Sequence, residues 1–446
     1  MPRQSPTWNK YGCFCFLPNE IASLVILARN DRLTALSPKV AVFLCRVRVI
    51  PICMCITQIS DGDGITDIAE LLPAGSAVAV VAAGAENASE YMRKMRRAGI
   101  KPRLLVACGE QRRIPCPNID DDVRLIAAYG GESEADCAKL LGKERKLPVY
   151  FVAAASAAIT ALTPQCRVWC GTALRLSEGA VPVGAAIDER ACELAKDLPD
   201  AFGGICAATA GVFDSEAYLR AVGKSVSPEV REEAFNLAYR ALDCAKKGRN
   251  ASGLCVELAR ISLRLASLAQ SAGLAFVRGA ADDCARTAQM LFAREERAQC
   301  GRGELAFLFG CALGKTYLEF VSGESGFTPP PDNNYRAEKL CEYLGFDELT
   351  AARAAISRMK NAELAAYRVR EYREELGLLA CDCVKVFDEA KRLFRRMYPD
   401  DGYSLKGKIE PSDLKLCMAL APDTFAVTGS ALTLMREFGL LERWLF

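Results

Sequence analysis

A glycine turn followed by polar helix positions has the residue types and spacing of a phosphate-binding site. Gly130 and Gly131 allow the backbone to turn close to a phosphate, and Ser133 stands where the following helix opens. Asp136 and Lys139 lie on that helix. By itself the turn is weak evidence, because an ordinary strand–helix connection uses the same residues.

Two residue counts limit the chemistry. The chain of 446 residues contains no histidine, which excludes every mechanism that needs imidazole as a base or metal ligand. It contains 21 cysteines, without the paired Cys-x-x-Cys spacing of zinc sites. We interpret them as free thiols that pack as small apolar residues, which favours a reducing, cytoplasmic location.

Charge and hydropathy narrow the class of partner. A net charge of +2 gives no basic surface for nucleic acid, so we expect a small-molecule partner, a phosphate or a dinucleotide. The longest apolar stretch, residues 40–57, is interrupted by Arg46 and Arg48, so we expect no membrane span. The N-terminus lacks the order of a signal peptide.

The elements around the turn alternate between strand and helix. Short apolar runs predict strands at 77–83, 104–107, 123–129 and 147–152, with helices at 87–98 and 134–142. This alternation is typical of a parallel, Rossmann-like sheet that binds ligands at the carboxyl ends of its strands.

From Ser227 onward the apolar residues recur at helical spacing. The pattern predicts helices at 229–246, 251–271, 281–299, 304–320, 335–343, 347–359, 362–375 and 384–397.

This order of motifs resembles the glycerol-1-phosphate dehydrogenase branch of the iron-containing alcohol dehydrogenase and dehydroquinate synthase superfamily. That branch has a glycine turn, an Asp-x-x-Lys helix and a strand opened by proline, as Gly130-Gly131, Asp136, Lys139 and Pro148 do here. The family's His-Gly-Glu motif resembles the segment that begins at Arg302.

The resemblance implies an α/β N-terminal Rossmann-like parallel-sheet domain followed by an all-α C-terminal domain, as in dehydroquinate synthase. We expect the first over residues 54–195 and the second over 196–446. Residues 1–53 lie outside the resemblance, as an extension of uncertain status. The resemblance also predicts small strands at 167–172 and 181–187 and a turn at 198–204. It is compatible with a homodimer.

The function that the resemblance implies is NAD(P)-dependent oxidoreduction of glycerol phosphate and dihydroxyacetone phosphate. It assigns cofactor binding to Gly130, Gly131, Ser133 and Asp136. Glu132 stands where the family has glycine or serine, and its carboxylate repels a pyrophosphate. We therefore expect a weakened site for NAD or NADP.

This chain lacks the residues that bind the metal ion in the family. Members hold one divalent metal with an aspartate and two histidines, and the resemblance places Ile159 at the aspartate. It places Asp283 and Thr287 at the two histidines of one helix motif, and Arg302 at a further ligand. A guanidinium stays protonated and cannot donate to a metal, so we expect no metal. Gly204 stands at another aspartate of the family.

Three interpretations remain open. In the first, the chain is a degenerate dehydrogenase kept as a ligand-binding or regulatory protein. In the second, it is an active, metal-independent oxidoreductase whose candidate catalytic residues are Arg302 and Lys139, with Asp283 as the partner of Arg302. In the third, it is a purely structural partner protein. For Arg302 itself two interpretations stay open: it replaces the charge of the metal and binds an anionic ligand, with Asp283 as its partner, or it forms a plain ion pair in the cleft.

Overall fold

The computed structural model describes residues of one compact unit, Ile56–Phe446. The described residues are 58–60, 62–106, 119–170, 173–195, 197–248, 253–272, 279–297, 300–322, 332–356, 359, 361–398, 409–424 and 429–441. The expected extension, residues 1–53, lies outside them.

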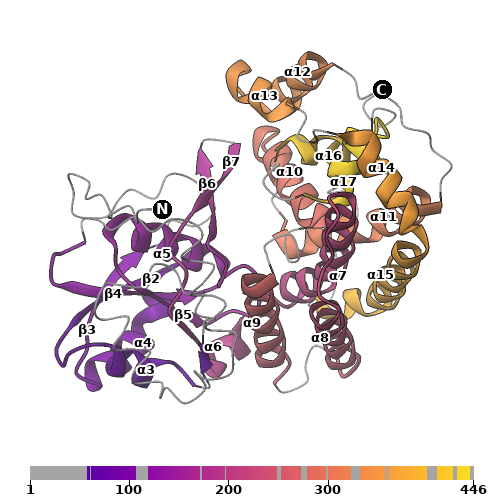
Figure 1. Cartoon of the computed structure of the whole chain (residues 1–446). Helices are drawn as coiled ribbons and strands as arrows, with labels where there is room; N and C mark the ends of the chain where they lie inside the picture. The colour runs from indigo at the N-terminus through magenta and orange to yellow at the C-terminus, as the bar shows by residue number, and fades with distance from the viewer. Residues whose placement is uncertain are drawn as a thin grey trace, which may run out of the picture. The chain divides into compact units, whose positions relative to one another are not determined.

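A six-stranded parallel sheet carries the expected glycine turn (Figure 1). Its strand order is β1-β8-β5-β4-β2-β3, with every neighbouring pair parallel. The strands are β1 (Gln58–Ser60), β2 (Ala77–Ala82), β3 (Lys101–Val106), β4 (Val123–Gly130), β5 (Val149–Ala153) and β8 (Gly184–Ile187). The predicted Rossmann-like sheet is confirmed.

Helices cover both faces of the sheet, as a parallel sheet requires. Side chains of β2 alternate between the faces. Val78 and Val80 pack with helices α3 (Ile65–Leu71) and α4 (Ala85–Arg97). Ala79 and Val81 pack in the cluster of α5 (Glu132–Arg145) and α9 (Leu254–Ala272). Since α9 comes from the helical half of the chain, that half supplies part of the sheet's own core.

A two-stranded antiparallel ribbon, β6 (Gln165–Cys170) and β7 (Ala173–Glu178), follows β5. The sequence predicted its first strand with shifted bounds and did not predict β7. After β8, the short helix α6 (Glu189–Leu194) leads to the helical half.

The helical half surrounds α7 (Leu198–Ala221), which is buried along most of its 24 residues. The other helices are α8 (Pro228–Lys246), α10 (Ala280–Arg294), α11 (Arg302–Ser322), α12 (Asn333–Leu344), α13 (Glu348–Ala355), α14 (Ala362–Glu371), α15 (Arg373–Phe394), α16 (Pro411–Thr424) and α17 (Ala431–Glu437). A single hydrophobic cluster joins α7 to these helices. The sheet domain followed by a helical domain is the fold that the sequence predicted.

The expectation of a turn at Leu198–Gly204 is wrong, because this segment is the start of α7. Pro199 lies in the first turn of the helix, where a missing N–H costs nothing. A Cβ on Gly203 would meet the backbone carbonyl group of Gly303. The glycine therefore serves close packing of α7 against α11 rather than chain reversal.

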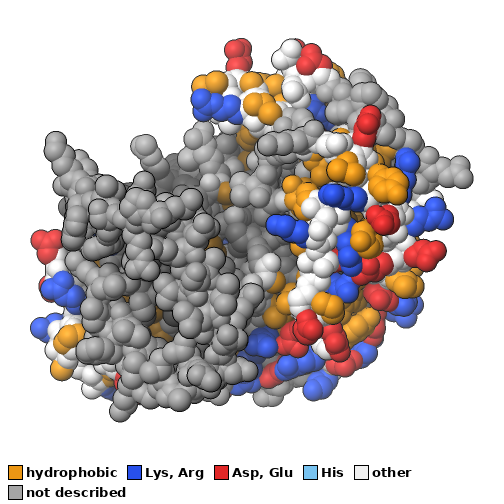
Figure 2. Space-filling view, in the orientation of Figure 1, with side chains coloured by type: hydrophobic (Ala, Val, Ile, Leu, Met, Phe, Trp, Pro, Cys, Tyr) orange, Lys and Arg blue, Asp and Glu red, His pale blue; other side chains and the backbone are white. Residues whose placement is uncertain are grey.

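Helix α11 is long and apolar enough to cross a membrane by length and composition. It packs against α7, α10 and α15, however, and a buried core helix passes the same test. On the face shown in Figure 2, the described Lys, Arg, Asp and Glu side chains are intermixed over the helical half.

Candidate functional site

The glycine turn lies where β4 ends and α5 begins. Gly130 has φ 153°, a conformation that favours glycine, and ends β4. The Gly131 N–H donates to the Glu134 carboxylate at 2.8 Å, so the first turn of α5 is capped from within. Ser133, the third expected cofactor residue, is exposed.

Lys139 is fully buried on α5 and holds the loop that follows β5. Its Nζ donates to the carbonyl oxygens of Thr160 at 3.2 Å, Thr163 at 3.0 Å and Gln165 at 2.8 Å. It also lies 2.9 Å from the carboxylate of Asp136. These contacts engage every donor of the ammonium group, which fixes the loop from residue 160 to 165 against α5.

Arg167 connects the expected cofactor helix to Glu132. Its Nε donates to Asp136 at 2.7 Å, and its backbone N–H donates to the same oxygen at 3.1 Å. Its Nη2 lies 3.2 Å from the Glu132 carboxylate. Burial alone would raise the pKa of Asp136, but Lys139 and Arg167 outweigh it and lower that pKa to about 2.

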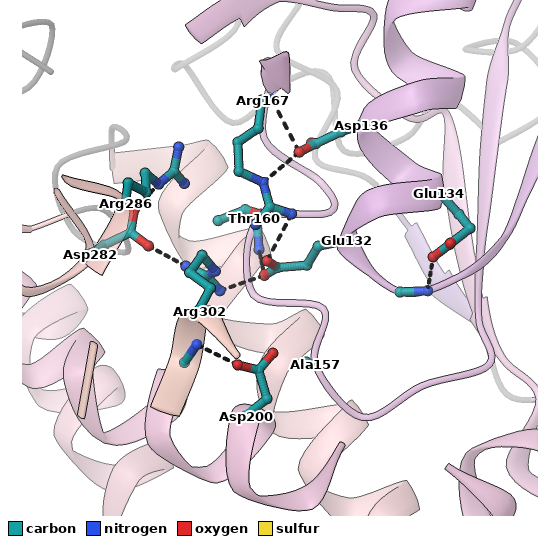
Figure 3. Close-up of polar contacts among 12 residues, drawn as sticks. Glu132, Glu134, Asp136, Ala157, Thr160, Arg167, Asp200, Asp282, Arg286 and Arg302 are labelled. Atoms are coloured by element: carbon teal, nitrogen blue, oxygen red, sulfur yellow. Dashed lines mark hydrogen bonds and ion pairs between the residues drawn. The ribbon is translucent and has the colours of Figure 1, made fainter. Parts of the chain in front are cut away.

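Glu132 is the centre of the site, because three separate parts of the chain donate to it (Figure 3). Its Oε1 accepts from the backbone N–H of Thr160 at 3.0 Å and from Arg302 Nη2 at 2.7 Å. Arg167 approaches its Oε2. Although burial opposes ionisation, the charges of Arg302 and Arg167 hold the pKa of Glu132 below its ordinary value.

Arg302 opens α11 and pairs with two carboxylates at once. Beside Glu132, its Nη1 donates to Asp282 on α10. Arg286, one turn further along α10, lies 2.8 Å from the other oxygen of Asp282. The carboxylate that pairs with Arg302 is therefore that of Asp282, one residue before Asp283, the partner expected from the sequence. Helical spacing turns successive residues to different sides, which explains the difference.

Backbone caps fix the two helices that bring these charges together. Asp200 on α7 accepts from the N–H groups of Gly303 and Glu304 at the start of α11. Burial raises the pKa of Asp200 to about 6. Asp214, about four turns further along α7, accepts from the N–H groups of Ala280 at 2.6 Å and Ala431 at 3.0 Å and so anchors the starts of α10 and α17.

The residues placed at the metal ligands do not form a ligand set. Ile159 lies in the apolar core of the helical half. The Thr287 hydroxyl donates to the Asp283 carbonyl within α10. A Cβ on Gly204 would lie 3.8 Å from Arg302 Nη2, so Gly204 is a position beside the arginine.

A resident divalent metal does not fit the described residues of this site. Arg302 places a positive guanidinium between Glu132 and Asp282, and this group repels a cation and donates no electron pair. Among the described residues, no group of three His, Cys, Asp or Glu side chains is placed to hold a metal ion. The absence of metal from the protein itself stays a prediction.

A dinucleotide phosphate would meet Glu132 at the turn. The Thr160 N–H and the Arg302 guanidinium, which suit an anion, are engaged by that carboxylate. In this conformation the Glu132 carboxylate occupies the donors that a phosphate group would otherwise use.

Comparison with solved structures identifies the fold. The chain is similar to an iron-containing alcohol dehydrogenase (TM-score 0.51, 14% identity, covering 87% of this chain and 97% of that one). It is also similar to YqhD of E. coli K-12 (TM-score 0.52, 13% identity, 87% and 97%). A third is the alcohol dehydrogenase ADH/D1 of an archaeon from a Red Sea brine pool (TM-score 0.51, 12% identity, 87% and 97%).

No protein-family model and no curated protein matches the chain. At these identities the likeness establishes the fold alone. The chain has the fold of the iron-containing alcohol dehydrogenases, a parallel-sheet domain followed by a helical domain.

Sequence reasoning gave Arg167 and Arg286 no role at the site, and it interpreted Glu132 only as a source of repulsion. It noted Asp282 as a nearby carboxylate but chose Asp283 as the partner of Arg302. One signal was available. A glutamate in a glycine turn needs buried cations if it is to be stable, and such cations are supplied from 35 to 170 residues along the chain.

Proposed function

We propose that this protein is a non-catalytic, ligand-binding derivative of an NAD(P)-dependent oxidoreductase. The observation that carries the proposal is the placement of Arg302, which donates to Glu132 and Asp282 at the start of α11. Hydride transfer in metal-dependent members of this fold needs a cation that polarises the substrate oxygen. Two carboxylates neutralise the guanidinium here, and it is buried.

Support for the ligand class comes from the resemblance to the glycerol-1-phosphate dehydrogenase branch and from the order of glycine turn, helix and strand in this chain. A phosphorylated polyol or a dinucleotide is the ligand that such a scaffold would retain. The alternative, a metal-independent oxidoreductase, would require Arg302 or Lys139 to act on substrate. The contacts of Lys139 to three carbonyl oxygens and of Arg302 to two carboxylates weigh against that role.

The test uses the full chain with dihydroxyacetone phosphate and NADH or NADPH, and with glycerol 1-phosphate and NAD or NADP in the other direction. Metal content is measured by mass spectrometry on the same preparation. We expect no turnover above the protein-free rate and no stoichiometric divalent metal. Turnover that a chelator abolishes, or metal-free turnover that Arg302→Lys abolishes, contradicts the proposal.

A further inference from the structure

The site around the Glu132 carboxylate contains more hydrogen-bond donors than the carboxylate accepts from. The Thr160 N–H and Arg302 Nη2 share its Oε1, and Arg167 Nη2 approaches its Oε2. Two more donors lie on the same residues. Within the described part of the chain, neither Thr160 Oγ1 nor Arg302 Nε has a hydrogen-bond partner, and both residues are more than nine-tenths buried.

The unused donors lie on groups already committed to Glu132. Nε and Nη2 form one edge of the planar guanidinium, so an oxyanion that accepts from Nη2 is in reach of Nε. A buried donor that has no acceptor destabilises the protein, because it has lost its hydrogen bonds to water. A tetrahedral oxyanion has more acceptor oxygens than a carboxylate and is therefore the better complement to this set.

Arg167 has the most exposed side chain of the three charged residues at the site. Its side chain is partly exposed, whereas those of Glu132 and Arg302 are almost wholly buried. In Figure 3 the guanidinium groups of Arg167 and Arg302 and the backbone N–H of Thr160 point toward the Glu132 carboxylate. Glu132 lies in the first turn of α5, where the helix dipole also favours an anion.

We propose that Glu132 is a built-in competitor at an anion site formed by Arg302, Arg167 and Thr160, and that the site takes a phosphoryl group when Glu132 withdraws. The inference rests on the proposed function, because it names the ligand class of the same site. A phosphoryl group enters as free phosphate, as a sugar or polyol phosphate or as part of a dinucleotide, and the chemistry of recognition is the same.

The first experiment measures the Kd of inorganic phosphate for the full chain by calorimetry in chloride buffer of constant ionic strength. Glu132→Gln keeps the size of the side chain and removes its charge, and we expect it to bind phosphate at least tenfold more tightly than the wild type. The matched control is Glu134→Gln, which removes the other buried carboxylate in the first turn of α5. Glu134 caps Gly131, so this control should keep the wild-type Kd.

A second variant assigns the donors. Glu132→Gln/Arg302→Lys keeps the positive charge but loses the guanidinium edge, and we expect it to lose the gained affinity. Titrations with glycerol 1-phosphate and with NADPH then distinguish the source, since the natural one binds more tightly than phosphate and with the same need for Arg302.

Equal phosphate affinity for wild type, Glu132→Gln and Glu134→Gln would overturn the inference and leave the proposed lack of catalysis untouched. Turnover by the wild type would contradict the proposed lack of catalysis and leave the anion-site inference untouched. If Glu132→Gln does not fold, the inference predicts that phosphate during refolding restores it whereas chloride at equal ionic strength does not. Failure of phosphate there would also overturn it.

Discussion

At the scale of single residues, the buried charged side chains of the sheet half are paired with one another instead of being hydrated, and these pairs hold its elements together. Lys139, Asp136, Arg167 and Glu132 form a continuous chain of ion pairs. It continues through Arg302 to Asp282 and Arg286. Taking such groups out of water is costly, and removing one partner leaves another uncompensated. The effect of a substitution should therefore depend on burial far more than on residue type.

Lys139→Met tests this dependence. The variant leaves Asp136 and three carbonyl oxygens without their buried donor. We expect the free energy of unfolding in urea to fall by about 3–5 kcal/mol. The control is Lys143→Met on the same helix, where an exposed pair with Glu178 is lost, and a change below about 1 kcal/mol is expected there. Equal effects of the two would contradict the assignment.

Acid should weaken the same chain of ion pairs. The pKa of Asp136 falls from the ordinary 3.8 to about 2, so its contribution is complete above pH 4 and is lost as the pH falls toward 2. Between pH 5 and 2.5 the wild type should lose about 2 kcal/mol more stability than Asp136→Asn. Asp243→Asn, which removes an exposed carboxylate, should keep the wild-type profile. Parallel profiles for wild type and Asp136→Asn would contradict the ion-pair assignment.

At the scale of elements, small residues decide how closely helices approach. Gly203 on α7 faces the backbone of Gly303 on α11, whereas the next residue, Gly204, has room for a methyl group. Of these two neighbouring glycines, only Gly203 is required by the close approach of the two helices. The start of α11 depends on this approach, because Asp200 on α7 caps it.

Gly203→Ala should destabilise the fold by about 2 kcal/mol, because its Cβ forces α7 away from α11. Gly204→Ala is the matched control. Its Cβ makes only ordinary contacts, and alanine favours a helix by up to about 1 kcal/mol, so neutrality or a small gain is expected. Thermal and urea unfolding measure both. A Gly203→Ala variant as stable as Gly204→Ala would refute the packing argument.

The sequence predicted the sheet and most helices because their signals are local. The apolar runs at β2 and β5 and the three-to-four spacing in α8 and α15 each lie within one element. The start of α7 was missed because Pro199 and Gly203 look like turn residues until the packing partner is known. The bond between Glu132 and Arg302 joins positions 170 residues apart, and no local pattern encodes it.

At the scale of the whole molecule, two kinds of ion pair join the sheet half to the helical half. Glu132 and Arg302 meet in the interior, and Glu189 on α6 pairs with Arg260 on α9 at the surface. Coulomb attraction is less screened in the interior, so the buried pair should couple the halves more strongly.

Double-mutant cycles compare the two pairs directly. For Glu132→Gln with Arg302→Met we expect a coupling energy of at least about 2 kcal/mol in urea unfolding. For Glu189→Gln with Arg260→Met, a coupling below about 1 kcal/mol is expected, with strong sensitivity to salt. Equal couplings would indicate that Glu132 and Arg302 are solvated in solution.

Helix α9 completes one face of a sheet whose strands all precede it in the chain. During synthesis the apolar face that α9 covers therefore stays uncovered until the whole of α9 has emerged, 78 residues after the end of α6 (272 − 194). A fragment that ends after α6 would keep all the strands of the sheet but leave this apolar face exposed to water.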